Sequence, residues 1–133
     1  MDLTINYLKS GWAELSLLIG EDEKTLYFEN VPNDPIYEIL ESAIKSACNV
    51  DSTITLYNLS KRISLTIKKI ENYLCRIEYD NSHWDLPVKT YCKSVLRMFD
   101  TYIFNFSIDD FTKNWGYFPE KDLERLRTIY HEL

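Results

Sequence analysis

The sequence predicts an α+β fold, an antiparallel sheet of about five strands covered by helices. Two alternating runs open the chain, one helical segment follows, three more alternating runs come next, and helical spacing fills the remainder. Strands joined by short polar turns pair as antiparallel neighbours, and helices grouped between and after them form a covering layer. We therefore expect the order strand–strand–helix–strand–strand–strand–helix–helix–helix in a single domain, residues 1–133.

The first hairpin is predicted from two alternating stretches. Apolar and polar residues alternate over 3–7 and again over 13–19, with Gly11 between them. Gly11 marks either a bulge in one long strand or a turn between two strands. The polar turn at 20–23 then leads into a partner strand over 25–30, as expected for a hairpin.

A helix is predicted to begin after Asp34 and to end near Asn49. Asp34 is suited to accept hydrogen bonds from the free N–H groups of the first turn, and Pro35 fits the first helical position. Glu38 and Glu41 fall on the polar side. The apolar side is formed by residues at helical spacing, namely Ile36, Ile39, Leu40, Ala43, Ile44 and Ala47.

Three further strands are predicted over 53–57, 63–68 and 73–79, with short polar links between them. Together they are typical of an antiparallel meander. The alternation stops at Asp80–Asp85, which we interpret as a solvated connection.

The C-terminal part is predicted to be helical. A long helix is expected from about Leu86 to Phe106, with Asp85 as its N-cap and Pro87 in its first turn. Ser107–Asp110 resembles a capping box that opens a short helix, and residues 119–133 form the last helix.

Charge and hydropathy limit the classes of function. The 133 residues carry a formal net charge of −6, which argues against binding to a nucleic-acid backbone, because such binding depends on clustered Lys and Arg. We identify neither a secretory signal at the N-terminus nor an apolar run long enough to span a membrane. We therefore expect a cytoplasmic protein that does not associate with membranes.

The three cysteines, Cys48, Cys75 and Cys92, are odd in number and widely spaced. They form no CxxC pair, so neither a disulfide framework nor a zinc site is predicted. Each lies in an apolar-rich segment, and we expect all three to be buried, reduced thiols.

Catalytic motifs are missing from the sequence. It contains no GxSxG, HExxH, P-loop or GxGxxG pattern. The best candidate for an active loop is Asp80–Asp85, which includes His83, but we favour a connection in which Trp84 anchors the loop and Asp85 caps the next helix. The sequence thus predicts a protein that is not an enzyme and that uses no cofactor and no metal.

An acidic segment is the strongest indication of function. Between residues 20 and 41, seven carboxylates against a single lysine leave a net charge of −6. Such a surface favours association with a basic protein partner, because complementary charge raises association rate and specificity. The predicted partner-binding residues are Glu21, Asp22, Glu23, Glu29, Asp34, Glu38 and Glu41.

A basic group on the central strands supports an alternative function. Lys68 and Arg76 are expected on one sheet face, and Tyr73 and Tyr79 resemble an aromatic stacking platform. The alternative is a ligand- or nucleic-acid-binding regulatory domain, although charged strands also simply deter edge pairing. The basic residues are Lys61, Arg62, Lys68, Lys69 and Arg76.

Three short segments carry a resemblance to known proteins. They are Gly11-Trp12-Ala13-Glu14, Asn33-Asp34-Pro35 and Trp115-Gly116-Tyr117-Phe118-Pro119. Together they resemble a widespread group of small, functionally uncharacterised bacterial α+β proteins. Some small acidic proteins of this general kind serve as immunity proteins in polymorphic-toxin and contact-dependent growth inhibition systems. The resemblance implies an immunity protein or antitoxin that neutralises a toxin domain by binding its basic surface, and it transfers no residue roles.

Overall fold

The N-terminal sheet consists of three antiparallel strands in the order β1-β2-β3. They are β1 (Asp2–Lys9), β2 (Trp12–Ile19) and β3 (Asp22–Glu29) in a computed structural model that describes residues 1–59 and 61–133. Ser10 and Gly11 have φ values of 51° and 83° and form the turn between β1 and β2. Gly11 therefore marks a turn between two strands rather than a bulge in one.

A second antiparallel sheet has the order β4-β5-β6-β7. Its strands are β4 (Ser52–Asn58), β5 (Lys61–Glu71), β6 (Leu74–Tyr79) and β7 (Ser82–Pro87). The link expected between β4 and β5 includes residue 60, which lies outside the described residues. The α+β class and the antiparallel pairing are confirmed, but the prediction of one sheet of about five strands is wrong, because the described residues form seven strands in two sheets.

The unpredicted strand is β7, which occupies the segment interpreted as a connection. Asp80 and Asn81 have φ values of 48° and 65°, and this tight turn sends the chain back along β6. Pairs such as Ile77 with Trp84 continue the sheet. The sequence signal was weak because His83 and Asp85 lie on the solvent face and the turn contains no glycine.

Four helices lie in the described residues: α1 (Pro35–Ala47), α2 (Val88–Asn105), α3 (Ile108–Asn114) and α4 (Glu120–Glu132). Asp34 caps α1 by accepting a hydrogen bond from Tyr37 N at 3.1 Å. Ser107 caps α3 in the same way, accepting from Asp110 N at 2.9 Å. The expectation that Asp85 caps α2 is wrong, because the helix begins after Pro87 without a side-chain cap and Asp85 belongs to β7.

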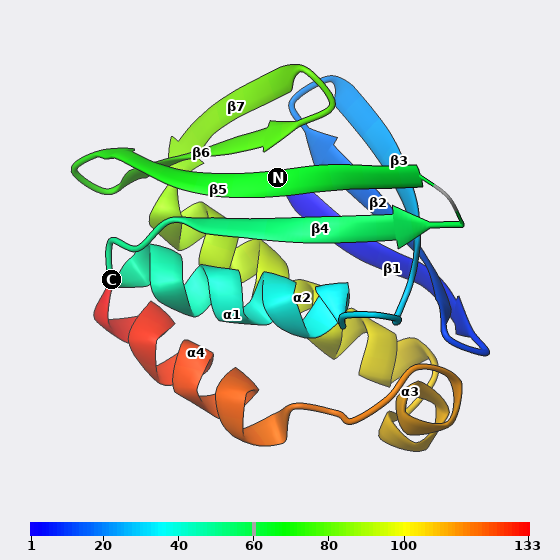
Figure 1. Cartoon of the computed structure of the whole chain (residues 1–133). Coiled ribbons are helices and arrows are strands. Elements are labelled where there is room, and N and C mark those ends of the chain that lie inside the picture. Colours follow the sequence, from blue (N-terminus) through cyan, green and yellow to red (C-terminus); the bar gives the residue numbers. More distant parts are fainter. Residues whose placement is uncertain (60) are drawn as a thin grey trace.

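The two sheets lie next to each other, and the helices lie together on one side of both sheets, below them in the view of Figure 1. β3 packs beside β4 without belonging to its sheet, while α2 packs on β1, and α1 packs on β4 and α2. α4 covers the side of α1 and α2 away from the strands. This arrangement leaves the outer face of each sheet open to solvent.

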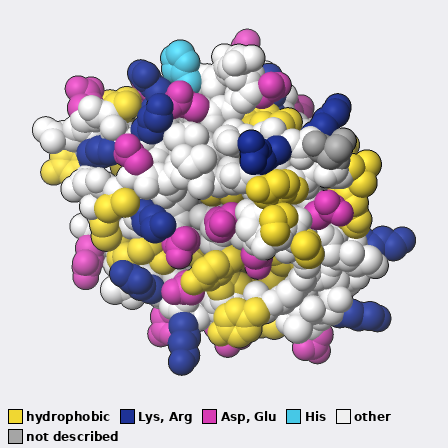
Figure 2. All heavy atoms as spheres, viewed as in Figure 1, with side chains coloured by type: hydrophobic (Ala, Val, Ile, Leu, Met, Phe, Trp, Pro, Cys, Tyr) yellow, Lys and Arg dark blue, Asp and Glu magenta, His cyan; other side chains and the backbone are white. Residues whose placement is uncertain are grey.

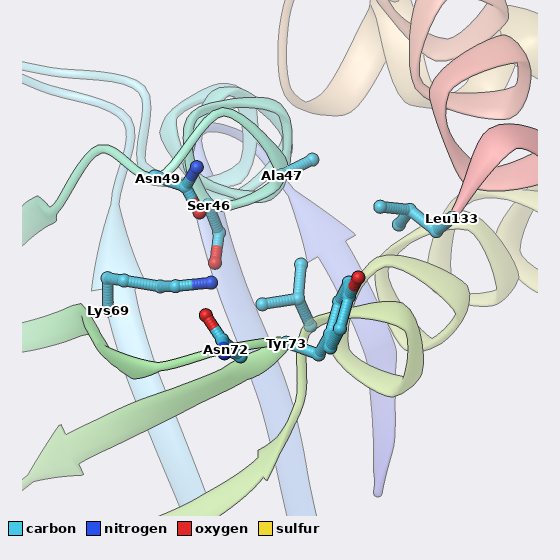
Figure 3. A pocket seen from close by; sticks show the side chains of 8 residues that line it. Ser46, Ala47, Asn49, Lys69, Asn72, Tyr73 and Leu133 are labelled. Atoms are coloured by element: carbon cyan, nitrogen blue, oxygen red, sulfur yellow. The ribbon is translucent and has the colours of Figure 1, made fainter.

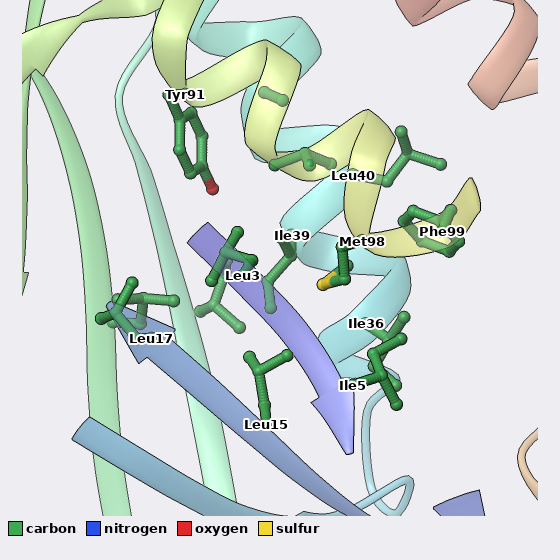
Figure 4. Close-up of a cluster of buried hydrophobic side chains, with 14 of the residues drawn as sticks. Leu3, Ile5, Leu15, Leu17, Ile36, Ile39, Leu40, Tyr91, Met98 and Phe99 are labelled. Atoms are coloured by element: carbon green, nitrogen blue, oxygen red, sulfur yellow. The ribbon is translucent and has the colours of Figure 1, made fainter. Parts of the chain in front are cut away.

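The hydrophobic core lies between the inner faces of both sheets and the helices, and Figure 4 shows the part of it between β1-β2-β3, α1 and α2. Burying a large aliphatic or aromatic side chain contributes about 1.5–3 kcal/mol to folding. These contacts therefore fix the positions of the strands and helices that carry the surfaces described below. The inward side chains include Leu3, Ile5, Leu15 and Leu17 from the strands, Ile36, Ile39 and Leu40 from α1, and Tyr91, Met98 and Phe99 from α2.

The three segments that carry the resemblance meet at one structural node. Gly11 N donates to Asn114 O at 2.8 Å, and Asn30 Nδ2 donates to Trp115 O at 2.7 Å. Trp115 Nε1 in turn donates to Asp34 Oδ1 at 2.8 Å. The node joins the first turn, the start of α1 and the end of α3. A role in folding therefore accounts for the residues of these three segments.

The cysteines are free thiols, but they differ in burial. Cys75 and Cys92 are buried as expected, and burial raises the pKa of the Cys92 thiol to about 12. The expectation for Cys48 is wrong, because it follows the last turn of α1 and is exposed. Among the helices described, we find none that combines the length and apolar character required to cross a membrane.

Candidate functional site

The structure divides the predicted acidic residues between the two ends of β3. Glu21, Asp22 and Glu23 lie at the β2–β3 turn, and Glu29 lies at the far end of the strand. The seven residue steps from Asp22 to Glu29 correspond to about 23 Å of extended chain. Proximity in sequence therefore does not place these carboxylates together.

The carboxylates of α1 are engaged within the chain. Asp34 caps the helix and accepts from Trp115, and Glu38 accepts from Asn33 Nδ2 at 2.6 Å. Glu41 lies 3.4 Å from the Lys45 ammonium, one turn further along the helix. Asp34 and Glu38 thus have local structural roles, while Glu41 forms an exposed pair of the kind that contributes little to stability.

Asp22 also has a partner from a distant part of the chain. Trp84 Nε1 donates to Asp22 Oδ2 at 2.8 Å, which joins β7 to the β2–β3 turn. Trp84 therefore anchors the segment around it, as the sequence predicts, although that segment is a strand. Glu21 and Glu23 remain exposed beside it.

The outer face of β1-β2-β3 presents aromatic side chains between carboxylates. Side chains of paired residues in adjacent strands lie on the same face of a sheet, and one such row contains Tyr7, Glu14 and Tyr27. The next row contains Lys9, Trp12 and Glu29. Tyr7 and Tyr27 are 42% and 48% exposed, respectively, so solvent rather than protein covers a large part of both rings.

Hydrogen bonds order the polar groups of this outer face. Asn6 Nδ2 donates to Glu14 Oε2 at 2.9 Å and to Ser16 Oγ at 2.7 Å. The hydrogen bond to Glu14 and the charge of that carboxylate raise the pKa of Tyr27. The Glu14 carboxylate therefore lies directly beside an exposed aromatic ring.

A hollow of about 380 Å³ lies at the other end of this face. Asp2 and Glu23 line it together with Leu18, and Ser16 contributes a hydroxyl. Arg97 of α2 also lines it and places one cation beside these carboxylates. The combination of two carboxylates with an apolar wall suits the ammonium or guanidinium end of a long side chain and its aliphatic stem.

We name the outer face of β1-β2-β3 the acidic-aromatic face. Its carboxylates belong to Asp2, Glu14, Glu23 and Glu29, and the one lysine among its rows is Lys9. Only two of these carboxylates were predicted from sequence. The others, together with Tyr7, Trp12, Leu18 and Tyr27, could have been found from the alternation within 2–9, 12–19 and 22–29 once the hairpin register was known.

Two of the five residues in the basic group on the central strands, Lys68 and Arg76, are paired with carboxylates. Lys68 and Arg76 are cross-strand partners on one face, as predicted. Lys68 Nζ lies 2.7 Å from Glu78 Oε1, and Arg76 donates to both oxygens of Asp85 at 2.7 and 3.0 Å. Figure 2 shows basic and acidic side chains interspersed over this side of the molecule.

The expected stacking platform is not formed. Tyr79 is 8% exposed and faces the core, while Tyr73 is 80% exposed at the opposite end of β6. His83 is exposed and lies opposite Glu78 in the sheet. In the part of the chain that the structure describes, no group of three His, Cys, Asp or Glu side chains is arranged to hold a metal ion.

Comparison with known proteins gives no relative for this chain: no family model, no curated protein and no solved structure matches it.

Proposed function

We propose that the chain is a non-enzymatic protein-binding module that docks a basic protein partner on the acidic-aromatic face. The observation that carries this proposal is the row Tyr7, Glu14, Tyr27, in which two half-exposed rings flank a carboxylate. Tyrosine and tryptophan are enriched among the residues that dominate binding energy at protein interfaces. Carboxylates around them favour a partner rich in Lys and Arg.

The form of this function that we favour is an immunity protein or antitoxin acting in the cytoplasm. It would neutralise a toxin domain by covering the basic surface with which that domain engages its target. The acidic charge of the chain and the resemblance of its short segments to bacterial α+β proteins support this role. Of the residues predicted from sequence, Glu21, Glu23 and Glu29 remain candidates for partner contact, because their carboxylates are not used within the described structure.

The alternative, nucleic-acid binding by the central strands, receives less support. Lys68 and Arg76 already pair with Glu78 and Asp85, so a phosphate backbone would have to compete with these carboxylates. Nucleic-acid interfaces rely on cations that are free to replace the counterions of phosphate groups.

Co-expression with the product of the neighbouring gene tests the proposal. We expect the chain to co-purify with that product and to protect cells from it, and Tyr27→Ala to weaken binding at least tenfold, as truncation of an interface anchor does by about 1.4 kcal/mol or more. Tyr117→Ala is the matched control, because Tyr117 is 73% exposed and lies between α3 and α4. Equal binding by wild type and Tyr27→Ala, or absence of both binding and protection, would contradict the proposal.

A further inference from the structure

A pocket of about 370 Å³ opens where the C-terminal end of α1, the β5–β6 turn and the start of α2 meet (Figure 3). Small-molecule sites have volumes of about 300–1,000 Å³, so this pocket has the size of a site for a small ligand. It lies away from the acidic-aromatic face. Its lining includes Ser46, Asn49, Lys69, Asn72, Tyr73 and Val88.

Lys69 is a charged residue on the core-facing side of a sheet. Alternation along β5 places it on the same side as Leu65 and Ile67, both of which are buried, and its cross-strand partner is the buried Cys75. Its neighbour Lys68 points the other way and pairs with Glu78. Lys69 is partly exposed, and across residues 1–59 and 61–133 it has no ion-pair partner.

The local backbone directs the Lys69 side chain into the pocket and leaves its ammonium free. The register of β5 against β6 shifts between Lys69 and Glu71, and such bulges re-aim side chains. Asp51 accepts a hydrogen bond at 2.8 Å from the backbone N of Lys69. At the end of α1, the carbonyls of Lys45 and Ser46 already accept from residues 48–50, so they compete little for the ammonium.

The groups around the ammonium are hydrogen-bonding side chains. Figure 3 shows the Lys69 side chain crossing the pocket toward Ser46, with the carboxamide oxygen of Asn72 facing the ammonium and Asn49 lying beyond Ser46. Rotation of the Asn72 carboxamide turns its N–H₂ group toward a bound anion. Carboxamide N–H₂ groups donate two hydrogen bonds and a serine hydroxyl donates one. Together with the ammonium, these donors suit a carboxylate or phosphate group.

Tyr73 supplies the opposite, apolar side of the pocket from a strained position. Its φ is 62°, a conformation that a bulky residue rarely adopts and that glycine adopts freely. Its side chain is nevertheless 80% exposed at the pocket mouth. Strain of this kind, held at a ligand-sized pocket, points to a role for the ring.

We propose that this pocket binds a small molecule in which an anionic group is attached to an aromatic or apolar portion. Lys69 pairs with the anionic group, and Asn49 and Asn72 donate hydrogen bonds to it. The apolar portion contacts Val88 and stacks on the ring of Tyr73. The site is independent of the protein-docking function proposed above.

Titration of the full chain with phenyl phosphate and with benzoate, followed by two-dimensional amide NMR, tests the proposal. We expect saturable shifts confined to residues around the pocket for one or both compounds at millimolar concentration, and weaker binding of inorganic phosphate and of phenol, each of which supplies only half of the ligand. The compound that binds with the higher affinity shows whether the pocket prefers a phosphate group or a carboxylate group.

Variants assign the binding to the named residues. Lys69→Gln is expected to weaken binding about tenfold, as loss of a charge-assisted contact does, while the matched Lys68→Gln, on the outer side of the same strand, leaves it unchanged. Asn72→Ala, on the exposed turn, provides a second test if Lys69→Gln does not fold. Tyr73→Gly is expected to raise stability while weakening phenyl phosphate binding. Absence of saturable shifts, or equal affinity of Lys69→Gln, Asn72→Ala and wild type, would overturn the proposal.

Discussion

The node at Gly11 allows a quantitative test of the fold. A Cβ atom on Gly11 would lie 2.8 Å from Asn30 Oδ1 and 3.3 Å from its Cγ, and the backbone φ of Gly11 is 83°. The Asn30 carboxamide has little freedom to retreat, because its Nδ2 donates to Trp115 O at 2.7 Å. Gly11→Ala therefore places a non-glycine residue in the left-handed region and also makes its Cβ clash with Asn30, whose side chain is fixed by the hydrogen bond to Trp115.

The expected cost of Gly11→Ala follows from these two effects. A non-glycine residue in the left-handed region loses about 1–2 kcal/mol, and displacing Asn30 loses a hydrogen bond with a net contribution of about 1 kcal/mol. We therefore expect the free energy of unfolding to fall by about 2–3 kcal/mol. Urea denaturation, followed by circular dichroism and tryptophan fluorescence, measures it.

Gly20→Ala is the matched control, because Gly20 also has a positive φ, 61°, but nothing lies within 4 Å of the position of its Cβ. Gly20→Ala should therefore lower the free energy of unfolding only by the backbone cost, about 1–2 kcal/mol, without the further loss of about 1 kcal/mol from the Asn30 hydrogen bond. In an Asn30→Ala background, the penalty of Gly11→Ala should fall to that of Gly20→Ala. If Gly11→Ala and Gly20→Ala prove equally destabilising in the wild-type background, the steric account of the node is refuted.

Two further predictions concern thiol reactivity and acid stability. Ellman's reagent should modify Cys48 in the native protein and reach Cys75 and Cys92 only after unfolding. The reason is that Cys75 and Cys92 are buried and their thiol pKa values are raised. Rapid modification of all three thiols in the native protein would contradict this packing. The hydrogen bond from Arg76 lowers the pKa of Asp85 in the folded protein. The contribution of the Asp85 carboxylate to stability is therefore complete above the pKa of Asp in the unfolded chain, about 3.9. This contribution is lost as the pH falls through the lower pKa of the folded state. The difference in urea midpoint between wild type and Asp85→Asn should therefore shrink below about pH 4, and a difference that stays constant would exclude the pairing.

Local signals in the sequence identified most of the elements but not their arrangement. The alternation around Gly11, the Asp34–Pro35 start of α1 and the Ser107 cap are encoded within a few residues, and each is confirmed. β7 was missed because its turn, Asp80–Asn81, uses left-handed non-glycine residues. The division into two sheets depends on how β3 packs beside β4, which no local pattern specifies.

The candidate site was predictable only in part for a related reason. Counting charge along the chain grouped Glu21 with Glu41. In the fold, an extended strand and a helix lie between these two residues and separate them in space. The acidic-aromatic face instead joins Glu14 with Tyr7 and Tyr27 across three strands. Such a grouping requires the register of both hairpins, and side chains on one face are separated in sequence by the turns between the strands.

The most direct test of the docking proposal is the rate of association with the product of the neighbouring gene at several salt concentrations. Glu14→Gln with Glu29→Gln removes two charges from the acidic-aromatic face, and Glu124→Gln with Glu132→Gln removes two from α4. We expect the first pair to slow association several-fold and to reduce its salt dependence, because charges at an interface steer encounter. The second pair should leave both unchanged. Equal effects of the two pairs, or no effect of the first, would contradict the proposal that this face receives the partner.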